Sequence, residues 1–288
     1  MTSRRGSALL SGGFRHAGFL PIHDNGVAMT DDVDILALGL LDPAQIEVAW
    51  IAPRTAQSAA AQERITAHWN EHITEARRQQ RVLFNSPIAR LLGAKQPNPG
   101  GPLRLELTGG DYRSFFVTCV RDHPWFKANA PEALHEALGN SLLLTHGNHV
   151  VLGVRSDAVA SYRGYAHVFG GVLEPPAADA AADGSFILDH LQRELLQEIG
   201  LSLQALKHPP KLIALLRDHQ LHQPELVWWG ELAPGNAKYD VAFEEHDQLL
   251  TLPLQDALIT GEPAIPLTPV ARAAIALLQA TRQANAQQ

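Results

Sequence analysis

Residues 165–201 decide the fold, and they read YAHVFGGVLEPPAADAAADGSFILDHLQRELLQEIGL. The stretch begins with an apolar strand pattern and a glycine pair, followed by a loop rich in Ala and Pro. From Ser185 onward, apolar residues recur near the 3.6-residue period, and Gly200 provides a stop signal. The apolar positions are Phe186, Ile187, Leu191, Leu195 and Ile199. We therefore predict a strand, a turn and an amphipathic helix that packs on a sheet, with Ser185 as its N-cap.

The predicted helix carries two glutamates, Glu194 and Glu198, one helical turn apart. Residues at this spacing lie about 5–6 Å apart at Cβ, so the two carboxylates can share a divalent cation. Mg²⁺ is the expected ion, because it takes oxygen ligands and binds through one or two carboxylates plus substrate phosphates. Taken alone, acids at i and i+4 are also common on solvated helix faces, where they repel each other slightly. The spacing by itself leaves both interpretations open.

The pattern resembles the Nudix box, the signature of hydrolases that cleave a nucleoside diphosphate linked to another moiety. The matching residues are Gly171, Arg193-Glu194-Leu195, Gln197-Glu198 and Gly200-Leu201. Two positions depart from the box. Ser185 stands where the family has a glutamate, eight positions before the arginine, and Gln197 replaces the first glutamate of the EE pair. Each departure removes a carboxylate, so we expect weaker Mg²⁺ binding than the family pattern implies.

The resemblance narrows to Nudix proteins that split UDP-glucose and UDP-galactose. The segments that carry it are residues 84–91, 107–116, 151–156 and 169–175, the last of which matches a GGxxEP turn. This resemblance implies an α/β/α sandwich with a mixed sheet, preceded by a smaller α+β domain. The order of the predicted elements separately favours an α/β layer arrangement.

The resemblance also implies metal-binding and catalytic residues. The implied ligands of Mg²⁺, or of Mn²⁺ in its place, are Glu194, Glu198, the amide oxygen of Gln197 and the backbone carbonyl of Gly170. Arg193 would orient the carboxylates and the glycine turn. Glu245 and its neighbour Glu244 are candidate general bases, because the family often keeps a loop glutamate in this part of the chain. His246 is a weaker candidate.

Four further residues are candidates for contacts to the substrate: Arg155, Tyr112, Phe116 and Glu174. Arg155 follows a predicted strand and would bind a phosphate in a bidentate manner, unless it forms a surface salt bridge. Tyr112 and Phe116 would form a wall on which a nucleobase stacks, although aromatic residues in such positions are more often part of the core. Glu174 belongs to the GGxxEP turn and would lie either near the metal or on the loop surface.

The composition limits the classes of function. A net charge of −7 gives no basic footprint for nucleic acid or for an anionic membrane. No apolar run reaches ~18 residues, so a transmembrane helix is excluded. Cys119 is the only cysteine, which rules out an intrachain disulfide and a cysteine zinc site, and we expect a cytoplasmic protein. The first 23 residues lack acids, a weak transit-peptide-like bias, but a disordered arm is the favoured interpretation.

The 288 residues are enough for one large or two modest domains. We predict a flexible arm at residues 1–29, an N-terminal α+β domain at 30–128 and a Nudix hydrolase domain at 129–288. Hairpins are predicted for residues 33–41 with 46–51 and for 141–146 with 150–154. Other predicted strands are 103–107, 115–120, 211–216 and 225–232, and other predicted helices are 56–80, 129–140, 252–260 and 269–284.

One motif points to a different chemistry. Residues 68–72 read HWNEH and match H-x-x-E-H, in which two histidines on one helix face bind Zn²⁺ beside a glutamate. A third ligand is not evident and five-residue matches arise by chance, so we do not expect a metallopeptidase.

The sequence thus predicts a Mg²⁺-dependent Nudix diphosphatase for a small-molecule nucleotide sugar of the UDP-glucose or UDP-galactose type. Its products would be a nucleoside monophosphate and a sugar 1-phosphate. An ADP-ribose-type Nudix hydrolase is the nearest alternative. A catalytically weak nucleotide-binding sensor is the other, because Ser185 and Gln197 both reduce the acidity of the box.

Overall fold

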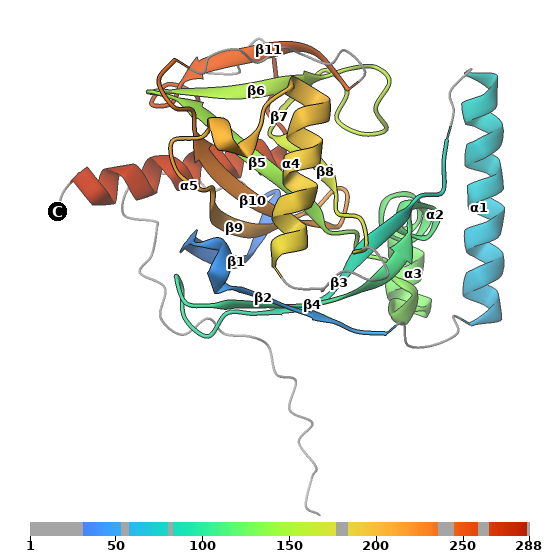
Figure 1. The fold of residues 1–288 in the computed structure, drawn as a ribbon. Helices are drawn as coiled ribbons and strands as arrows, with labels where there is room; N and C mark the ends of the chain where they lie inside the picture. The colour runs from blue at the N-terminus through green and yellow to red at the C-terminus, as the bar shows by residue number, and fades with distance from the viewer. Residues whose placement is uncertain are drawn as a thin grey trace, which may run out of the picture.

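The computed structural model describes residues 31–52, 58–79, 83–176, 184–235, 245–258 and 265–286 (Figure 1). The arm predicted at residues 1–29 lies outside these ranges, and so does Glu244. Among the described helices, none combines the length and the apolar character needed to cross a membrane.

An eight-stranded sheet forms the centre of the structure. Its strands run in the order β1-β9-β10-β5-β6-β11, with β7 paired to β6 and β8 paired to β5. Their bounds are β1 Val33–Leu41, β5 Gly139–His146, β6 His149–Arg155, β7 Ala166–His167, β8 Phe169–Val172, β9 Lys211–Asp218, β10 Gln223–Glu231 and β11 His246–Pro253. Strand β10 is parallel to β5, whereas the other neighbours are antiparallel. The predicted mixed sheet is therefore confirmed.

Apolar residues on alternate positions of β5 pack on the two faces of this sheet. Leu142 and Leu144 belong to the cluster that includes helix α4, Ser185–Ile199, while Leu143 belongs to the cluster that includes helix α5, Pro269–Ala286. Successive strand residues point to opposite faces, so the two helices cover opposite sides of the sheet, as Figure 1 shows. The predicted α/β/α arrangement is confirmed.

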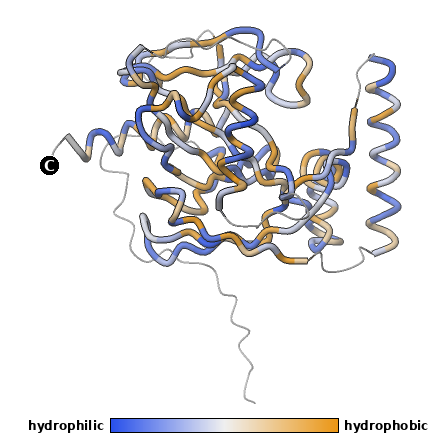
Figure 2. Tube along the Cα trace, viewed as in Figure 1, coloured by the Kyte–Doolittle hydropathy of each residue, from blue (hydrophilic) through white to orange (hydrophobic). Residues whose placement is uncertain are grey.

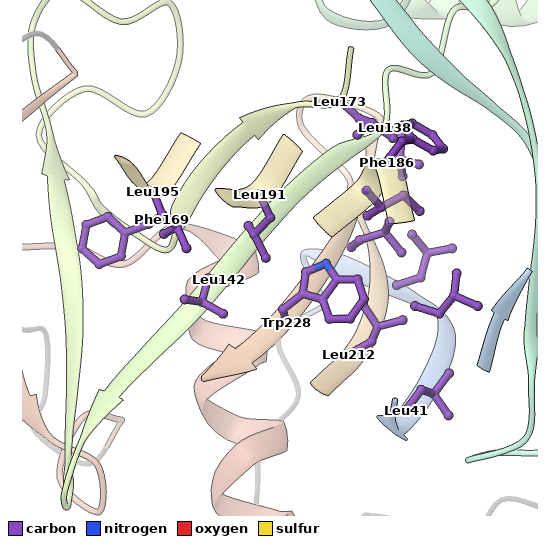
Figure 3. Packing of buried hydrophobic residues seen from close by; sticks show 14 of the residues in the cluster. Leu41, Leu138, Leu142, Phe169, Leu173, Phe186, Leu191, Leu195, Leu212 and Trp228 are labelled. Carbon is purple, nitrogen blue, oxygen red and sulfur yellow. The ribbon is translucent and has the colours of Figure 1, made fainter. Parts of the chain in front are cut away.

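Helix α4 is anchored by its apolar stripe. Leu191 and Leu195 pack in one cluster with Trp228 of β10, and Figure 3 shows these side chains together. Burial of each such side chain stabilises the fold by roughly 1.5–3 kcal/mol relative to exposure. The helix ends at Gly200, whose φ of 64° lies in the left-handed region that favours glycine. Its N-cap is Gly184, so Ser185 is the first helical residue and not the N-cap that we predict from the sequence.

A second, three-stranded sheet has the order β2-β4-β3. Its strands are β2 Ile46–Trp50, β3 Pro87–Lys95 and β4 Leu103–Asp111. Leu103, Leu105 and Leu107 of β4 belong to the same buried cluster as the apolar stripe of α4. The small sheet therefore closes the core on the α4 side of the large sheet.

The remaining helices lie beside the small sheet, with α1 Ala59–Arg78 standing apart from the large sheet (Figure 1). The others are α2 Tyr112–Phe115, the π-helix η3 Phe116–Arg121, α3 His123–Asn129 and the short 3-10 turns η2 Pro43–Gln45 and η4 Pro131–Ala133. The 3-10 turn η5 Leu203–Ala205 instead follows α4 and lies at the end of β10, where the N–H of Ala233 donates to the carbonyl of Ala205. Polar and apolar residues alternate along α1 in Figure 2. Its buried residues Ile65 and Trp69 pack with Val117 and Phe126.

Several predicted elements are confirmed: helix α1, helix α5, the hairpin β5–β6 and the strands β4, β9 and β10. The predicted hairpin of residues 33–41 and 46–51 is wrong. Strand β1 pairs with β9 of the large sheet and β2 pairs with β4 of the small one. The turn signal at Asp42-Pro43 is real, but η2 redirects the chain from one sheet to the other.

Three other predictions are wrong for related reasons. Residues 115–120 are helical, because Asp111 caps the backbone N–H of Ser114 and the apolar side chains then meet α1 and β3. In place of a helix at residues 129–140, Asn129 ends α3, residues 131–133 form the turn η4 and the chain enters β5 at Gly139. Residues 252–253 complete strand β11, which pairs with β6 through Pro253, and residues 259–260 lie outside the described ranges. Sheet membership also does not follow the predicted domain boundary, since β1 belongs to the large sheet.

Candidate active site

A pocket of about 290 Å³ lies where α2 and η3 approach the large sheet. Six of the residues named above as site candidates line it: Tyr112, Phe116, Arg155, Gly170, Glu194 and Glu245. These residues come from α2, η3, the end of β6, β8, α4 and the start of β11, elements that are far apart in the sequence. The fold therefore gathers most of the predicted site in one place.

Helix α4 holds two carboxylates against the glycine turn of β8: Glu194 lines the pocket, whereas Glu198 is 5% exposed and is not among the residues that line it. The backbone N–H of Gly170 donates a hydrogen bond to Glu198 Oε2 at 2.9 Å. Glu194 lies against Gly171, where a Cβ atom would collide with Glu194 Oε2. Glycines at both positions thus let two carboxylates approach the backbone of the turn.

Both carboxylates lie in an environment that disfavours their charge. Burial, reinforced by the charges of Glu198 and Glu245, raises the pKa of Glu194 to about 7. Burial likewise raises the pKa of Glu198 well above its ordinary value, and the nearby Glu245 adds to the shift. A bound cation would offset the repulsion between these carboxylates.

A buried network holds α4 in position behind these glutamates. Asn140 Nδ2 donates to the carbonyl of Ile187 at 2.8 Å, and its Oδ1 accepts from Trp228 Nε1 at 2.8 Å. Burial lowers the pKa of His190 to about 4, and its Nε2 lies 3.1 Å from the carbonyl oxygen of Val172. We did not predict this network. Its signal in the sequence is weak, namely polar residues at buried positions of otherwise apolar elements.

His246, named above as a weak candidate base, lies behind Glu198. The ring is 1% exposed, and its Nε2 is 3.6 Å from Glu198 Oε1. Burial lowers the pKa of His246 to about 4, so the ring is neutral at pH 7. Glu245, one residue earlier, is exposed and lines the pocket. Of these two neighbours, Glu245 is the one that reaches the pocket.

Arg155 brings a positive charge to the same pocket. Its Nε donates to the carbonyl of Ser161 at 3.0 Å, which fixes the guanidinium plane. Burial lowers the pKa of Arg155, while the charges of Glu245, Glu225 and Glu198 oppose this shift. The guanidinium stays protonated, because arginine does not lose its proton in proteins. Its position permits contact with a phosphate group of a bound ligand.

Tyr112 and Phe116 form part of the pocket wall. Their rings are nearly parallel, at 26°, with centroids 6.3 Å apart. Phe115 and Val120 line the pocket beside them. This wall is apolar and suits a flat ring.

Three predicted site residues lie elsewhere in the described structure. Arg193 and Glu174 form a salt bridge of 3.1 Å in which both side chains are more than half exposed. Such exposed pairs contribute only ~0–1 kcal/mol. Gln197 is exposed on α4, and none of the three lines the pocket. Their predicted roles stay predictions.

The structure also reveals a buried carboxylate that we did not predict. Glu225 of β10 lines the pocket and is 7% exposed. Its Oε1 accepts a hydrogen bond from Ser141 Oγ and lies 3.5 Å from His167 Nε2. Burial opposes its charge, yet His167 and Ser141 hold the pKa of Glu225 below its ordinary value. In the sequence Glu225 stands at the start of an apolar strand, which does not distinguish it from a surface acid.

The oxygen donors beside the pocket are of the kind that a hard divalent cation takes. Within the described ranges, no group of three or more His, Cys, Asp or Glu side chains is already gathered as a metal site. Mg²⁺ does not need such a cage, because it binds through one or two carboxylates and completes its octahedron with water and substrate phosphates. The oxygens of Glu194 and Glu198 fit this requirement.

The H-x-x-E-H residues do not converge on a common point. His68 Nδ1 lies 3.3 Å from Glu71, and its Nε2 lies 3.4 Å from Asp122. The ring of His72 instead stacks on Phe116, with centroids 3.9 Å apart. The two imidazoles thus have separate partners.

Comparison with known proteins gave matches in structure only. No family model matches the chain, and no curated protein matches it. Nudix hydrolases are among the solved structures to which it is similar. One is the MutT Nudix hydrolase from Burkholderia pseudomallei, at 18% identity and a TM-score of 0.35, covering 48% of this chain and 95% of that one.

Two further similar structures carry ligands. The Nudix domain of Shewanella oneidensis NrtR, in complex with ADP ribose, has 14% identity and a TM-score of 0.38, and the match covers 58% of this chain and 97% of that one. A bifunctional NMN adenylyltransferase/ADP ribose pyrophosphatase from Francisella tularensis, with AMP and a Mn ion, has 16% identity and a TM-score of 0.37. That match covers 55% of this chain and 44% of the other. At such TM-scores the alignments assign no function, which has to be inferred from the site.

Proposed function

We propose that this protein is a Mg²⁺-dependent hydrolase of the Nudix type that cleaves the diphosphate of a nucleoside diphosphate sugar. One observation carries the proposal: the desolvated carboxylates of Glu194 and Glu198 are held against the Gly170-Gly171 turn beside a pocket that also contains Arg155. The carboxylates can hold a divalent cation that also binds phosphate oxygens, and the guanidinium can pair with a phosphate directly. Together they suit a bound diphosphate.

The chemistry follows from these positions. A divalent cation, when bound, would neutralise phosphate oxygens and acidify water. Glu194 and Glu198 would hold it, and the hydrogen bond from Gly170 would keep Glu198 oriented. Arg155 would bind the phosphate oxygens, and Glu245 would accept a proton from the attacking water.

The proposed reaction is hydrolysis of the diphosphate bond by one water molecule. The water oxygen forms a bond to one phosphorus, and the bond from that phosphorus to the bridging oxygen breaks. The bridging oxygen leaves with the second phosphate. The products are a nucleoside monophosphate and a sugar 1-phosphate.

The finer substrate assignment, UDP-glucose or UDP-galactose, rests on the sequence resemblance of residues 84–91, 107–116, 151–156 and 169–175. The apolar wall of Tyr112 and Phe116 is compatible with a nucleobase. ADP-ribose is the competing substrate, and both belong in the same experiment.

The test is a turnover assay on UDP-glucose, UDP-galactose, GDP-mannose and ADP-ribose, with Mg²⁺ and again with a chelator. We expect chelator-sensitive release of nucleoside monophosphate, fastest from the UDP-hexoses. In Glu198→Gln we expect turnover to fall by about a hundredfold or more, since loss of even the outer partners of metal ligands costs roughly 10–100-fold.

Glu231→Gln is the matched control. Glu231 lies at the far end of β10, where it pairs with Lys207 at 3.5 Å on the surface, so this substitution should leave turnover unchanged. Faster turnover of ADP-ribose would replace the UDP-sugar assignment. Binding of these nucleotides without turnover in Mg²⁺ would instead make the protein a sensor.

A further inference from the structure

The pocket reaches both faces of the large sheet. Glu194 belongs to α4 on one face. Glu225 points to the other face, because Val227 and Trp229, at the same parity along β10, pack with the α5 cluster. The pocket therefore brings together two carboxylates that are held by different elements on opposite sides of the sheet.

Glu225 is held firmly. Both of its side-chain contacts, to Ser141 Oγ and His167 Nε2, involve Oε1, and neither uses Oε2. His167 is held in turn by Thr268 Oγ1 at 2.7 Å from its Nδ1. On the neighbouring strand, a Cβ atom at Gly139 would lie 2.8 Å from Glu225 Cγ, so the glycine leaves room for the carboxylate. These contacts come from β5, β7 and the segment before α5.

The charge of Glu225 limits what it can bind. A buried, ionised carboxylate accepts hydrogen bonds but repels phosphate, so the phosphates of a ligand belong near Arg155 and near the cation that the α4 glutamates would hold. The lining of the same pocket also includes the apolar residues Phe115, Val120 and Leu221. A neutral ring that carries a hydrogen-bond donor suits these surroundings, because an acceptor in this place would leave Glu225 unpaired.

We propose that Glu225 determines which base or sugar the substrate carries. Its Oε2 would accept a hydrogen bond from a donor on the neutral ring of the substrate. The proposal rests on the hydrolase function inferred above for the identity of that substrate. Two groups supply the required chemistry: the ring N–H of a base such as uracil or guanine, and a hydroxyl of a sugar. The adenine of AMP has no ring N–H and donates only through its exocyclic amino group, and a deoxy sugar lacks one hydroxyl.

The test measures binding, so that it does not depend on turnover. Calorimetry with UMP, GMP, AMP, glucose 1-phosphate and 2-deoxyglucose 1-phosphate in Mg²⁺ compares the wild type with Glu225→Gln. The amide keeps the size of the side chain but replaces a charged acceptor, and a lost hydrogen bond to a charged group weakens binding about tenfold to a hundredfold.

Two patterns support the proposal and identify the donor. If Glu225→Gln binds UMP and GMP more weakly than the wild type but binds AMP almost equally, the donor is the ring N–H of the base. A loss for glucose 1-phosphate that is smaller for its 2-deoxy analogue identifies a hydroxyl. Glu225→Asp, which retains an acceptor, should recover part of the lost affinity in either case.

Equal affinities in wild type and Glu225→Gln, or an equal loss for every ligand, would overturn the proposal. Glu231→Gln on the same strand is the control and should bind as the wild type does. If Glu225→Gln does not fold, Glu225→Asp provides the second test, because the shorter carboxylate should weaken binding of the same ligands by a smaller factor, and affinities equal to those of the wild type would then overturn the proposal. Selective binding without chelator-sensitive turnover would refute the hydrolase function while leaving this inference intact.

Discussion

The backbone N–H of Gly170 donates a hydrogen bond to Oε2 of Glu198, with 2.9 Å between nitrogen and oxygen. Gly170 has a φ of 140°, and a Cβ atom there would collide with the carbonyl oxygen of Asn140 and lie 2.7 Å from Ser141 Cα. The neighbouring Gly171 faces Glu194 instead. Adjacent glycines therefore serve two different carboxylates of α4.

Gly170→Ala and Gly171→Ala should have different effects. Alanine at 170 meets backbone atoms and needs a strained φ, so we expect it to lower the free energy of unfolding by ~1–3 kcal/mol or more. Alanine at 171 meets only the tip of Glu194, so it should displace that carboxylate and weaken Mn²⁺ binding with little loss of stability. Urea denaturation and Mn²⁺ titration measure the two effects. Gly147→Ala, with a φ of 58° and no atom within 4 Å of its Cβ, is the control. If Gly147→Ala and Gly170→Ala lower the free energy of unfolding equally, the close contact of Gly170 with Asn140 and Ser141 does not contribute to the effect.

Arg155→Lys should weaken substrate binding although it keeps the charge. Lysine lacks the Nε donor that contacts Ser161 and cannot bind a phosphate in a bidentate manner. We expect KM to rise by about tenfold and kcat to change less, because one charge-assisted hydrogen bond is worth roughly 1.5–3 kcal/mol. Steady-state kinetics on the best substrate measure both. Arg104→Lys, at an exposed position of β4, should change neither parameter. An unaltered KM in Arg155→Lys would remove Arg155 from the substrate site.

Asn140→Leu should destabilise the fold, because it leaves Trp228 Nε1 and the carbonyl of Ile187 buried without their partner. An unsatisfied buried polar group costs ~1–3 kcal/mol. Chemical denaturation of Asn140→Leu, Trp228→Phe and the double variant forms a double-mutant cycle. Asn140→Leu should lower the free energy of unfolding less in the Trp228→Phe background, because that background has no indole N–H to leave without an acceptor. Additive costs would show that the two side chains are not coupled.

Stability should fall in acid partly through His135. Burial, together with the charge of Arg90, lowers the pKa of His135 to about 4, below the ordinary value of 6.5. Above pH 6.5 neither state binds this proton. Between about pH 6.5 and pH 4 the unfolded chain binds it and the folded chain does not, so the free energy of unfolding decreases by up to ~3 kcal/mol.

His135→Gln should lose less stability than the wild type over the same range. Urea denaturation at pH 7, 5.5 and 4 gives the comparison. Burial also lowers the pKa of His123, His190, His222 and His246, so the variant should keep part of the acid sensitivity. Parallel curves for the two proteins would show that His135 does not contribute.

Several local features of this protein can be predicted from its residues without knowledge of the fold. The apolar period of α4, the glutamates one turn apart and the hairpin around Gly147-Asn148 all follow from the residues in place. A helix face and a tight turn depend on neighbours within a few positions, so their pattern can be read without knowing the fold.

Which segments contact each other can be seen only in the tertiary structure. Strand β1 pairs with β9 and not with residues 46–51 as predicted, and residues 116–121 form a helix although their apolar run favours a strand. Likewise, Arg193 and Glu174 turn to the surface while Glu225 joins the pocket from the opposite face of the sheet. The partner of a strand and the burial of a carboxylate depend on contacts between residues far apart in the chain, and no local pattern encodes those contacts.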